Sequence, residues 1–341
     1  MHDGGAPALP EVSVVMPTHN RRDSLRRVLE ALDRQTILPG RFEVVVVCDG
    51  CTDGSAAMCR GLTTRYALRV FEQAKQGPAA ARNRAVTEAA GALIVFLDDD
   101  VVPIPGLLAE HLAEHAANDS VVVIGPLLAP PGFKLAPWTR WESVMLDAQY
   151  AAMAAGRWEP TARQFYTGNA SVRREHILAA GGFDPGFRRA EDVELAYRFQ
   201  AMKLTFKFSP SAKGWHYADR PLGAWLAAAR AYGEADVAMY RRGRLMTLQS
   251  MASEYRWRKP ALRRLARFCV GRSFIRAPVV ASALLAARAA DLVGLKATAE
   301  SAYSAVFNLT YWNGVSDALG GRPSFWSLIE TGQPPALRPP A

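Results

Sequence analysis

The sequence has few of the residues that build metal-bound or disulfide-linked folds. It contains four cysteines in 341 residues, and Cys48 and Cys51 form its single C-x-x-C pair, with no histidine nearby. Zinc sites usually take two such pairs, so we expect no zinc and expect reduced, buried thiols. Half of the residues are hydrophobic, which suffices for a core without such links.

Long hydrophobic runs are also lacking. The longest uncharged apolar run in the C-terminal region, residues 277–287, has 11 residues and ends at Arg276 and Arg288. A membrane-spanning helix needs about 20 apolar residues. The first ten residues lack the apolar segment of a secretory signal. We therefore expect no membrane span, no secretory leader and a cytoplasmic protein.

Acidic residues are nearly absent between Arg241 and Lys296. This stretch has 13 Lys and Arg residues against Glu254 and Asp291, a net charge of +11, whereas the whole chain carries +9. Such a region attracts anionic lipid headgroups, nucleic acid or an anionic acceptor, although a solvated helix face has the same composition.

Within this basic region, one predicted helix is amphipathic. An apolar stripe runs beside Arg263, Arg264 and Arg267, and it consists of Leu262, Leu265, Phe268 and Cys269. A basic amphipathic helix can lie on an anionic membrane, which would make the protein peripheral on the cytoplasmic face of a membrane. The same arginines could instead pack against the rest of the protein or bind phosphate. The region lacks the interleaved aromatic and basic residues that stack on bases, so no nucleic acid partner is expected.

Glycine-rich phosphate loops are missing as well. The chain has no G-x-x-x-x-G-K-[ST] and no G-x-G-x-x-G after its first predicted strand. A phosphate-bearing ligand would therefore be held through a metal ion and side chains. Two classes of protein stay open as alternatives to the hypothesis reached below. One is a nucleotidyltransferase with an α/β sheet, although such enzymes usually have a glycine-rich, lysine-bearing loop after the first strand. The other is a catalytically silent protein that binds membrane or nucleic acid.

What the first 125 residues do contain is an alternation of strands and helices. Hydrophobic runs predict strands at residues 12–16, 42–48, 68–71, 92–97 and 120–124. Helical spacing predicts helices at 22–35, 78–90 and 105–117. This order predicts an α/β fold with an open, mostly parallel, Rossmann-like sheet flanked by helices. Ligands then bind beyond the carboxyl ends of the strands.

The second half of the chain reads differently. The pattern weakens after residue 125, with helices predicted at 138–155, 174–180 and 193–202 and a strand at 204–208. After Pro221 helices continue to about residue 328, and the proline-rich residues 331–341 are expected to be disordered.

Polar residues gather where the predicted strands end. Thr18 follows the first strand, Asp49 the second, and Asp98, Asp99 and Asp100 follow the fourth. Consecutive aspartates repel one another unless they are solvated or bind a cation, and carboxylates two residues apart can hold Mg²⁺ or Mn²⁺ together with substrate phosphates. The triplet alone leaves two interpretations open, a site for a divalent metal, Mn²⁺ or Mg²⁺, and a solvated acidic turn.

Six motifs together resemble family 2 glycosyltransferases. They are P-T-H-N-R at 17–21, V-V-V-C-D-G-C-T-D-G at 45–54, G-P-A-A-A-R-N-R-A at 77–85, F-L-D-D-D at 96–100, and G-G-F-D at 181–184 followed by E-D-V-E-L at 191–195. The resemblance covers roughly residues 11–216. It implies a GT-A fold, a nucleotide-sugar donor, a divalent metal and inversion at the anomeric carbon.

The resemblance also implies roles for single residues on the donor side. Pro17 and Thr18 would line the nucleoside pocket, and Asp49 would accept a hydrogen bond from the base, most often uracil. Arg82 would reach the nucleoside or the phosphates. Asp98 would lie near the ribose and Asp100 would bind the metal. Cys48 stands where the family often has a further aspartate.

On the acceptor side, the resemblance makes Asp192 the general base, because a neutral hydroxyl is a poor nucleophile and a carboxylate must take its proton. Acids at a helix start are also favoured by the helix dipole alone, which is the other interpretation of Glu191 and Asp192. His216 is a second candidate metal ligand, since imidazole joins carboxylates on Mn²⁺, but it is also a plausible core histidine. Further acceptor-side candidates are Glu191, Asn169 and Trp138.

These observations lead to one main hypothesis. A GT-A domain would occupy residues 1–220, with a donor half at about 11–125 and an acceptor half at about 126–220; a basic helical region would occupy 221–330, before the tail at 331–341. The protein would be an inverting glycosyltransferase that moves a sugar from a nucleotide sugar, expected to be a UDP-sugar, to a glycan or lipid-linked acceptor in cell-envelope assembly.

Overall fold

The computed structural model describes residues 9–218, 220–244 and 246–333. The chain divides into two compact units, one of residues 1–134 and 143–218 and the other of residues 135–142 and 219–341. The sequence analysis placed this division at residue 220. The structure moves it by two residues and assigns the first turns of one helix, Leu135–Glu142, to the second unit.

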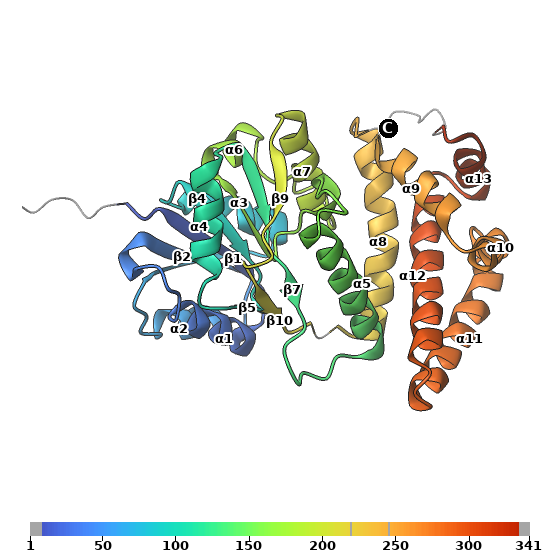
Figure 1. Cartoon of the computed structure of the whole chain (residues 1–341), viewed down its shortest axis with the longest axis horizontal. Coiled ribbons are helices and arrows are strands. Elements are labelled where there is room, and N and C mark those ends of the chain that lie inside the picture. Colours follow the sequence, from blue (N-terminus) through green and yellow to red (C-terminus); the bar gives the residue numbers. More distant parts are fainter. Residues whose placement is uncertain (1–8, 219, 245, 334–341) are drawn as a thin grey trace, which may run out of the picture. The chain divides into compact units, whose positions relative to one another are not determined.

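The first unit contains a seven-stranded sheet with the order β3-β2-β1-β4-β8-β6-β9 (Figure 1). Its strands are β1 (Val12–Thr18), β2 (Phe42–Asp49), β3 (Ala67–Gln73), β4 (Leu93–Leu97), β6 (Val121–Ile124), β8 (Asn169–Arg173) and β9 (Thr205–Phe208). Neighbouring strands run parallel except β8, which runs antiparallel to both β4 and β6. The sheet is mostly parallel, as the sequence predicted, but its antiparallel strand β8 was not predicted.

Helices cover both faces of this sheet, because its strands are apolar on both faces. On β2, Val45 and Val47 face one core cluster, and Val44 and Val46 face the other. The first cluster is covered by α3 (Pro78–Glu88), α5 (Pro137–Ala154), α6 (Arg174–Ala179) and α7 (Glu191–Ala201). The second is covered by α1 (Arg22–Leu32), α2 (Ser55–Arg60) and α4 (Leu107–Ala117).

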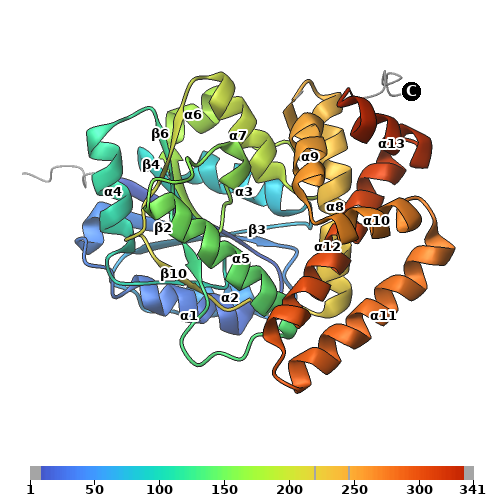
Figure 2. The same ribbon diagram turned by 45° about the vertical axis from the view of Figure 1, so that its right-hand side comes forward.

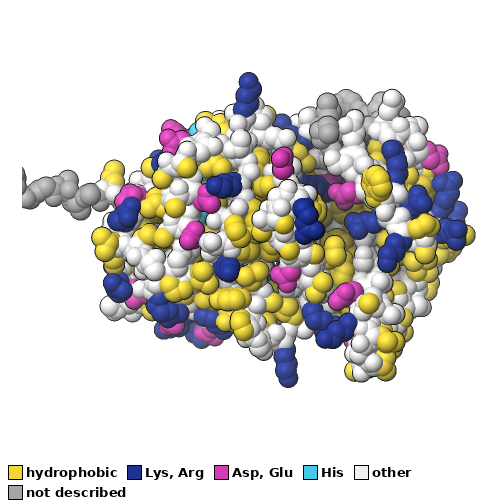
Figure 3. Space-filling view, viewed as in Figure 1, with side chains coloured by type: hydrophobic (Ala, Val, Ile, Leu, Met, Phe, Trp, Pro, Cys, Tyr) yellow, Lys and Arg dark blue, Asp and Glu magenta, His cyan; other side chains and the backbone are white. Residues whose placement is uncertain are grey.

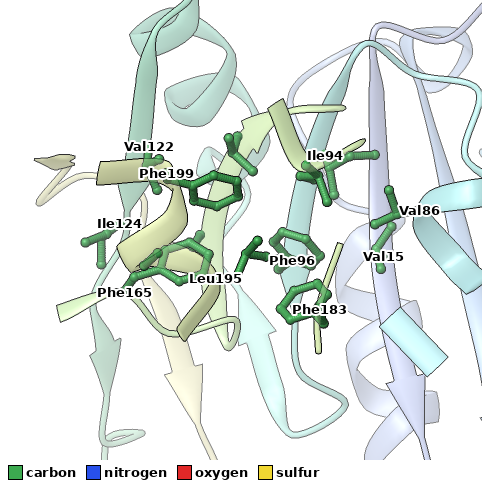
Figure 4. Packing of buried hydrophobic residues seen from close by; sticks show 14 of the residues in the cluster. Val15, Val86, Ile94, Phe96, Val122, Ile124, Phe165, Phe183, Leu195 and Phe199 are labelled. Carbon is green, nitrogen blue, oxygen red and sulfur yellow. The ribbon is translucent and has the colours of Figure 1, made fainter. Parts of the chain in front are cut away.

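Aromatic rings fill the first core cluster. Phe96 of β4 meets the edge of Phe183 at 5.4 Å between ring centroids, and Phe165 meets Phe199 of α7 at 6.0 Å (Figure 4). Leu195 of α7 is buried in the same cluster. The start of α7 is thereby fixed against the sheet, which matters for the polar residues in its first turn.

A second, three-stranded sheet was not predicted. It consists of β5 (Val101–Pro103), β10 (Gly214–His216) and β7 (Leu127–Leu128), in that order. β5 begins directly after the three aspartates, and its residue Val101 pairs antiparallel with His216. The small sheet therefore brings His216 to the end of β4.

The second unit is helical. Its main helices, after the first turns of α5, are α8 (Leu222–Arg241), α9 (Met246–Trp257), α10 (Pro260–Cys269), α11 (Ser273–Leu292), α12 (Lys296–Ala318) and α13 (Arg322–Thr331) (Figure 2). The predicted tail 331–341 falls almost wholly outside the described residues. Buried aromatic rings, among them Trp225 and Trp312, form the cores of this unit.

One helix among the described residues, α11, is long and apolar enough to cross a membrane by length and composition alone. The sequence analysis expected none, because it counted only the uncharged run between Arg276 and Arg288. The helix is 20 residues long and includes both arginines, and only 11% of its apolar window is buried. This finding by itself does not identify a span.

Candidate active site

The polar residues at the strand ends lie along one edge of the main sheet. β1 pairs in parallel with β2 on one side and with β4 on the other, so the ends of these three strands point the same way. Thr18 ends β1, Asp49 ends β2, and Asp98 follows β4 directly. The structure therefore brings together the three groups that the sequence placed at one sheet edge.

Asp49 organises the loop that precedes α3. Its carboxylate is buried and accepts hydrogen bonds from the backbone N–H groups of Gln76 (2.8 Å) and Gly77 (2.7 Å) and from the side chain of Gln73 (2.9 Å). Gly77 has φ +96°, which favours glycine. In this structure Asp49 holds a loop, and its contact with a nucleoside base stays a prediction.

Arg82 of α3 joins the donor half to the acceptor half. Its buried guanidinium donates to Asp98 Oδ1 at 3.0 Å and to Glu191 Oε1 at 2.7 Å. Burial lowers the pKa of Arg82, but the carboxylates of Asp98, Glu191 and Asp192 outweigh it and raise the pKa. Residues 82 and 191, 109 positions apart in sequence, thus meet across the site.

Asp192 lies beside this ion-pair network in the first turn of α7. Burial, and secondarily the charge of Glu191, raise the pKa of Asp192 to about 6, while Arg82 and the N–H groups of Val193 and Thr167 oppose the rise. Val193 N–H donates to Asp192 Oδ1 at 2.8 Å. A carboxylate with this pKa is a stronger base than an ordinary aspartate and is still mostly ionised at pH 7.

Asp100 and His216 approach each other at the start of the small sheet. His216 Nε2 lies 3.6 Å from Asp100 Oδ1, and the Asp100 carbonyl accepts a hydrogen bond from the backbone N–H of Tyr217 at 2.9 Å. The β5–β10 pairing fixes this approach. The two residues that the sequence analysis proposed as metal ligands are thus neighbours.

Arg21 is a site residue to which the sequence analysis gave no role. Its guanidinium contacts Asp99 Oδ1 at 3.1 Å and Asp100 Oδ2 at 2.5 Å. Asp99 is buried, and burial raises its pKa to about 6 against the opposing effect of Arg21. Arg21 ends the P-T-H-N-R motif after the first strand, and the three aspartates follow the fourth strand at the same sheet edge. These positions were the sequence signal that could have indicated the ion pairs of Arg21.

Comparison with known proteins identifies the family. Residues 13–182, about half of the chain, match Glycosyl transferase family 2. The chain belongs to this family. The resemblance and the fold class expected from the motifs are both confirmed.

Several curated glycosyltransferases are similar in sequence. A validoxylamine A glucosyltransferase of Streptomyces hygroscopicus subsp. limoneus is 32% identical over 239 residues, which cover 62% of this chain and 52% of that protein. A pre-mycofactocin glycosyltransferase of Mycobacterium tuberculosis is 28% identical over 237 residues, 67% of this chain and 47% of that protein. The chain thus spans about half the length of these relatives.

Solved structures share the fold. Mannosyltransferase PcManGT from Pyrobaculum calidifontis, solved with GDP-Man and Mn²⁺, has a TM-score of 0.63 at 20% identity, covering 90% of this chain and 87% of that chain. S. aureus TarS 1–349 has a TM-score of 0.52 at 15% identity, covering 91% of this chain and 92% of that chain. At these identities the similarity shows the fold only.

The donor set of this family 2 glycosyltransferase suits a divalent cation held in part by substrate. Within the described ranges, no three His, Cys, Asp or Glu side chains are grouped to hold a metal ion. Asp100 and His216 supply one carboxylate and one imidazole, close enough to share one ion. Hard divalent cations commonly take one or two protein ligands and complete their shell with water and phosphate oxygens. The residues therefore fit such an ion.

Two predicted donor contacts of the glycosyltransferase remain predictions. The Thr18 hydroxyl is buried and donates to Asp99 Oδ2 at 2.7 Å, and its contact with a nucleoside stays a prediction. Thr18 therefore positions the aspartate turn. Pro17 is half-buried and pairs with Val47 in the sheet register, and its contact with a nucleoside stays a prediction.

Asn169 is not an acceptor-side residue. It is fully buried at the start of β8, its amide NH₂ donates to the carbonyls of Ala212 (2.7 Å) and Pro126 (3.2 Å), and its Oδ1 lies 3.0 Å from His111 Nε2. These contacts use its polar atoms in the core, so the prediction was wrong.

Trp138 belongs to the helical unit. Its indole N–H donates to the Arg220 carbonyl at 2.7 Å, and its ring packs against the cluster of Trp141 and Trp225. A role toward the acceptor stays a prediction for Trp138, as it does for Glu191, whose carboxylate pairs with Arg82.

Proposed function

We propose that this family 2 glycosyltransferase moves a sugar from a nucleotide diphosphate sugar to an acceptor hydroxyl, with inversion at the anomeric carbon. The observation that carries the proposal is the Asp98–Arg82–Glu191 network. It ties the acidic turn after β4 to the start of α7, where Asp192 has a raised pKa. A donor site and a base are thereby held by one set of ion pairs.

On the donor side, Asp100 and His216 would hold Mn²⁺ or Mg²⁺, with the donor's diphosphate completing the shell. The bound cation would supply positive charge that stabilises the diphosphate as it leaves. The PcManGT structure, which holds GDP-Man and Mn²⁺ on the same fold, supports a divalent metal and a nucleotide sugar here. Asp98, fixed by Arg82, would lie near the ribose.

On the acceptor side, Asp192 would be the general base. The acceptor oxygen forms a bond to the anomeric carbon while the bond between that carbon and the diphosphate oxygen breaks, and the electron pair leaves with the nucleoside diphosphate. The acceptor proton passes to a carboxylate oxygen of Asp192. A base with a pKa near 6 suits this transfer at neutral pH, because it is ionised yet still takes up a proton.

The nucleotide is proposed to be a uridine diphosphate, with Asp49 accepting a hydrogen bond from the base. Asp49 already accepts one hydrogen bond from Gln73 at the end of β3 and two from the loop before α3, so this loop and the base would be held by the same carboxylate. The PcManGT complex contains a guanine nucleotide instead, and the base therefore has to be measured.

The acceptor is proposed to be a glycan or a lipid-linked glycan used in cell-envelope assembly, at the cytoplasmic face of a membrane. The basic region 241–296, with its net charge of +11, supports contact with an anionic membrane surface. Glu191 and Trp138 remain the candidates for acceptor contacts.

A thermal-shift panel tests the donor proposal. UDP, GDP and matching nucleotide sugars would be tested with and without Mn²⁺, and we expect the UDP series with Mn²⁺ to raise the melting temperature by mass action. Product analysis by NMR should then show the inverted anomer. Stabilisation by GDP alone would replace the uridine assignment, and a product that retains configuration would contradict the mechanism.

A further inference from the structure

One face of α11 is apolar and exposed along its whole length. Its side chains recur at helical spacing on a single stripe, which consists of Phe274, Pro278, Ala281, Leu285, Ala289 and Leu292. The large members have most of their surface in solvent: Phe274 is 77% exposed, Leu285 66% and Leu292 88%. Isolated exposed leucines are ordinary, but a continuous apolar stripe over five turns indicates an interaction surface.

The opposite face of α11 packs against other helices of its own unit. Ala287 and Ala290 are buried in the core of the helical unit, and α11 packs against α10 and α12. Figures 1 and 2 show α11 at the outer edge of this unit, with α12 on one side. In the described part of the unit, no helix covers the stripe.

Positive charge borders the stripe. Arg288 lies one helical turn from both Leu285 and Leu292, and Arg272 is the N-cap of α11. Both are exposed, as is Arg264 on the neighbouring helix α10, and none of the three pairs with a carboxylate among the described residues. Figure 3 shows Lys and Arg side chains gathered where Figure 1 places α10, beside yellow side chains along α11. Burial, and secondarily the charges of Arg272 and Arg267, lower the pKa of Arg322, so three guanidinium groups lie near one another.

We propose that α11 is an interfacial helix: it lies in the plane of an anionic phospholipid bilayer, with the Phe274–Leu292 stripe among the acyl chains and the arginines at the phosphate level. An amphipathic surface that combines large apolar side chains with a basic border matches this environment. The proposal deepens the membrane contact suggested above and rests on it, but it does not depend on the transfer chemistry.

Two other occupants fit less well. A membrane-spanning α11 would place Arg276 and Arg288 in the hydrocarbon and would also take in Asp291, which is paired with Arg140 on the packed face. A second copy of the chain on the stripe would bring the same unpaired arginines face to face, which is repulsive. An anionic bilayer satisfies both the apolar stripe and the charge.

Vesicle flotation of the full chain, without donor or acceptor, tests the proposal. We expect binding to phosphatidylcholine vesicles that contain phosphatidylglycerol, little binding to phosphatidylcholine alone, and weaker binding as salt increases. Leu285→Gln and Leu292→Gln should each weaken partitioning by about fivefold or more, because exposed apolar area is no longer buried. Arg272→Gln and Arg288→Gln should each weaken it by about fivefold, the effect of one charge at an anionic surface.

Leu178→Gln is the matched control, since Leu178 is an exposed leucine (49%) on α6 of the other unit and should leave partitioning unchanged. Loss of binding in the arginine variants but not in the leucine variants would overturn insertion of the stripe. Binding that resists high salt and alkaline extraction would indicate a span. A dimer in sedimentation velocity that Leu285→Gln abolishes, with no vesicle binding, would assign the stripe to a second copy.

Because this assay contains no nucleotide sugar, its outcome is separate from that of the transfer proposal. Vesicle binding with no nucleotide stabilisation would leave the interfacial helix standing and contradict the donor site. Nucleotide stabilisation without vesicle binding would support the donor site and contradict the interfacial helix.

Discussion

The ionisation of Asp192 sets the expected pH dependence of transfer. Its pKa is raised to about 6 by burial and by Glu191, and only the ionised form can accept the acceptor proton. We predict that kcat/KM is level near pH 7.5 and falls below about pH 6, tenfold for each further pH unit. Initial rates from pH 4.5 to 8.5 with a fixed metal concentration would measure this; an activity that stays level down to pH 5 would contradict it.

The variant Glu191→Gln tests whether the charge of Glu191 contributes to the raised pKa of Asp192. Removing the neighbouring negative charge should lower the pKa of Asp192, so the acid limb of the profile should move to lower pH than in the native protein. The position of this limb separates an electrostatic effect from a general loss of structure, which would lower the rate at every pH equally. An unmoved limb would show that Glu191 does not set the pKa.

At the scale of single residues, the sequence indicated where charged side chains lie better than it indicated which hydrogen bonds the polar side chains make. Asp100 and His216 were expected near each other and lie 3.6 Å apart. Asn169 was misjudged because a polar side chain in T-G-N-A-S looks available for binding, whereas its partners, the carbonyls of Ala212 and Pro126, come from distant loops. The contact between Thr18 and Asp99 depends on a turn after β4 that no local pattern indicates.

At the scale of elements, α4 is docked on the sheet by two buried histidines. His111 lies 2.8 Å from the Ser171 hydroxyl and 3.0 Å from Asn169 Oδ1, and His115 lies 2.9 Å from the same hydroxyl. Burial lowers the pKa of His111 to about 4 and that of His115 to about 3. Both are therefore neutral in the folded protein at pH 7.

Because these histidines are buried and neutral, we predict that the free energy of unfolding falls in acid. Each has a folded pKa below its unfolded value of 6.5, so the unfolded state binds more protons below pH 6.5. Stability is thus intact above pH 6.5 and is lost as pH falls toward 4, by up to about 1.4 kcal/mol per pH unit for each histidine. Urea unfolding of His111→Gln and native protein from pH 7.5 to 4.5 would measure it; equal slopes would contradict the prediction.

The crossing of α8 and α12 depends on two glycines. A Cβ on Gly233 would lie 2.2 Å from the Tyr311 carbonyl oxygen, and one on Gly314 would lie 2.2 Å from that of Arg230. We predict that Gly233→Ala or Gly314→Ala separates these helices and lowers the free energy of unfolding by about 1–3 kcal/mol. Denaturant titration followed by circular dichroism would measure the loss.

Gly223→Ala is the matched control for this crossing. Gly223 lies in the same helix, α8, and an added Cβ meets nothing within 4 Å. Alanine has the higher helix propensity, so this change should be neutral or should stabilise by up to about 1 kcal/mol. If all three variants behaved alike, the close approach of α8 and α12 would not be important for stability.

Elements with a strong periodicity were predictable, and short or polar ones were not. The hydrophobic run at 42–48 predicted strand β2, and the helical spacing at 22–35 predicted helix α1. Strand β8, N-A-S-V-R, was missed because Asn169 and Ser171 are polar and are satisfied only by α4 and by distant loops. The two- and three-residue strands of the small sheet exist only through their tertiary pairing.

At the scale of the whole molecule, the chain divides into two compact units, one of which is helical and contains the basic region 241–296. What composition could not show is which face of a helix is left without a partner. The stripe on α11 becomes visible only when burial separates Ala287 and Ala290 from Leu285 and Leu292.

We predict that a nucleotide stabilises the folded chain only when a divalent metal ion is present. A nucleoside diphosphate with Mn²⁺, at about 100 times its dissociation constant, should stabilise the folded state by about 2.7 kcal/mol. Addition of EDTA should remove most of this, and His216→Ala should reduce it, because Asp100 alone then remains of the pair. Scanning calorimetry would measure the shift. Equal stabilisation with and without EDTA would remove the metal from the account.

The most direct test of the account compares donor binding and transfer in one preparation of Asp192→Asn. We predict that calorimetry gives a nucleotide affinity within about twofold of the native protein, while kcat falls at least about a hundredfold, as expected when a general base is lost. Normal turnover by Asp192→Asn would contradict the central claim that this carboxylate, beside the Arg82 network, takes the acceptor proton.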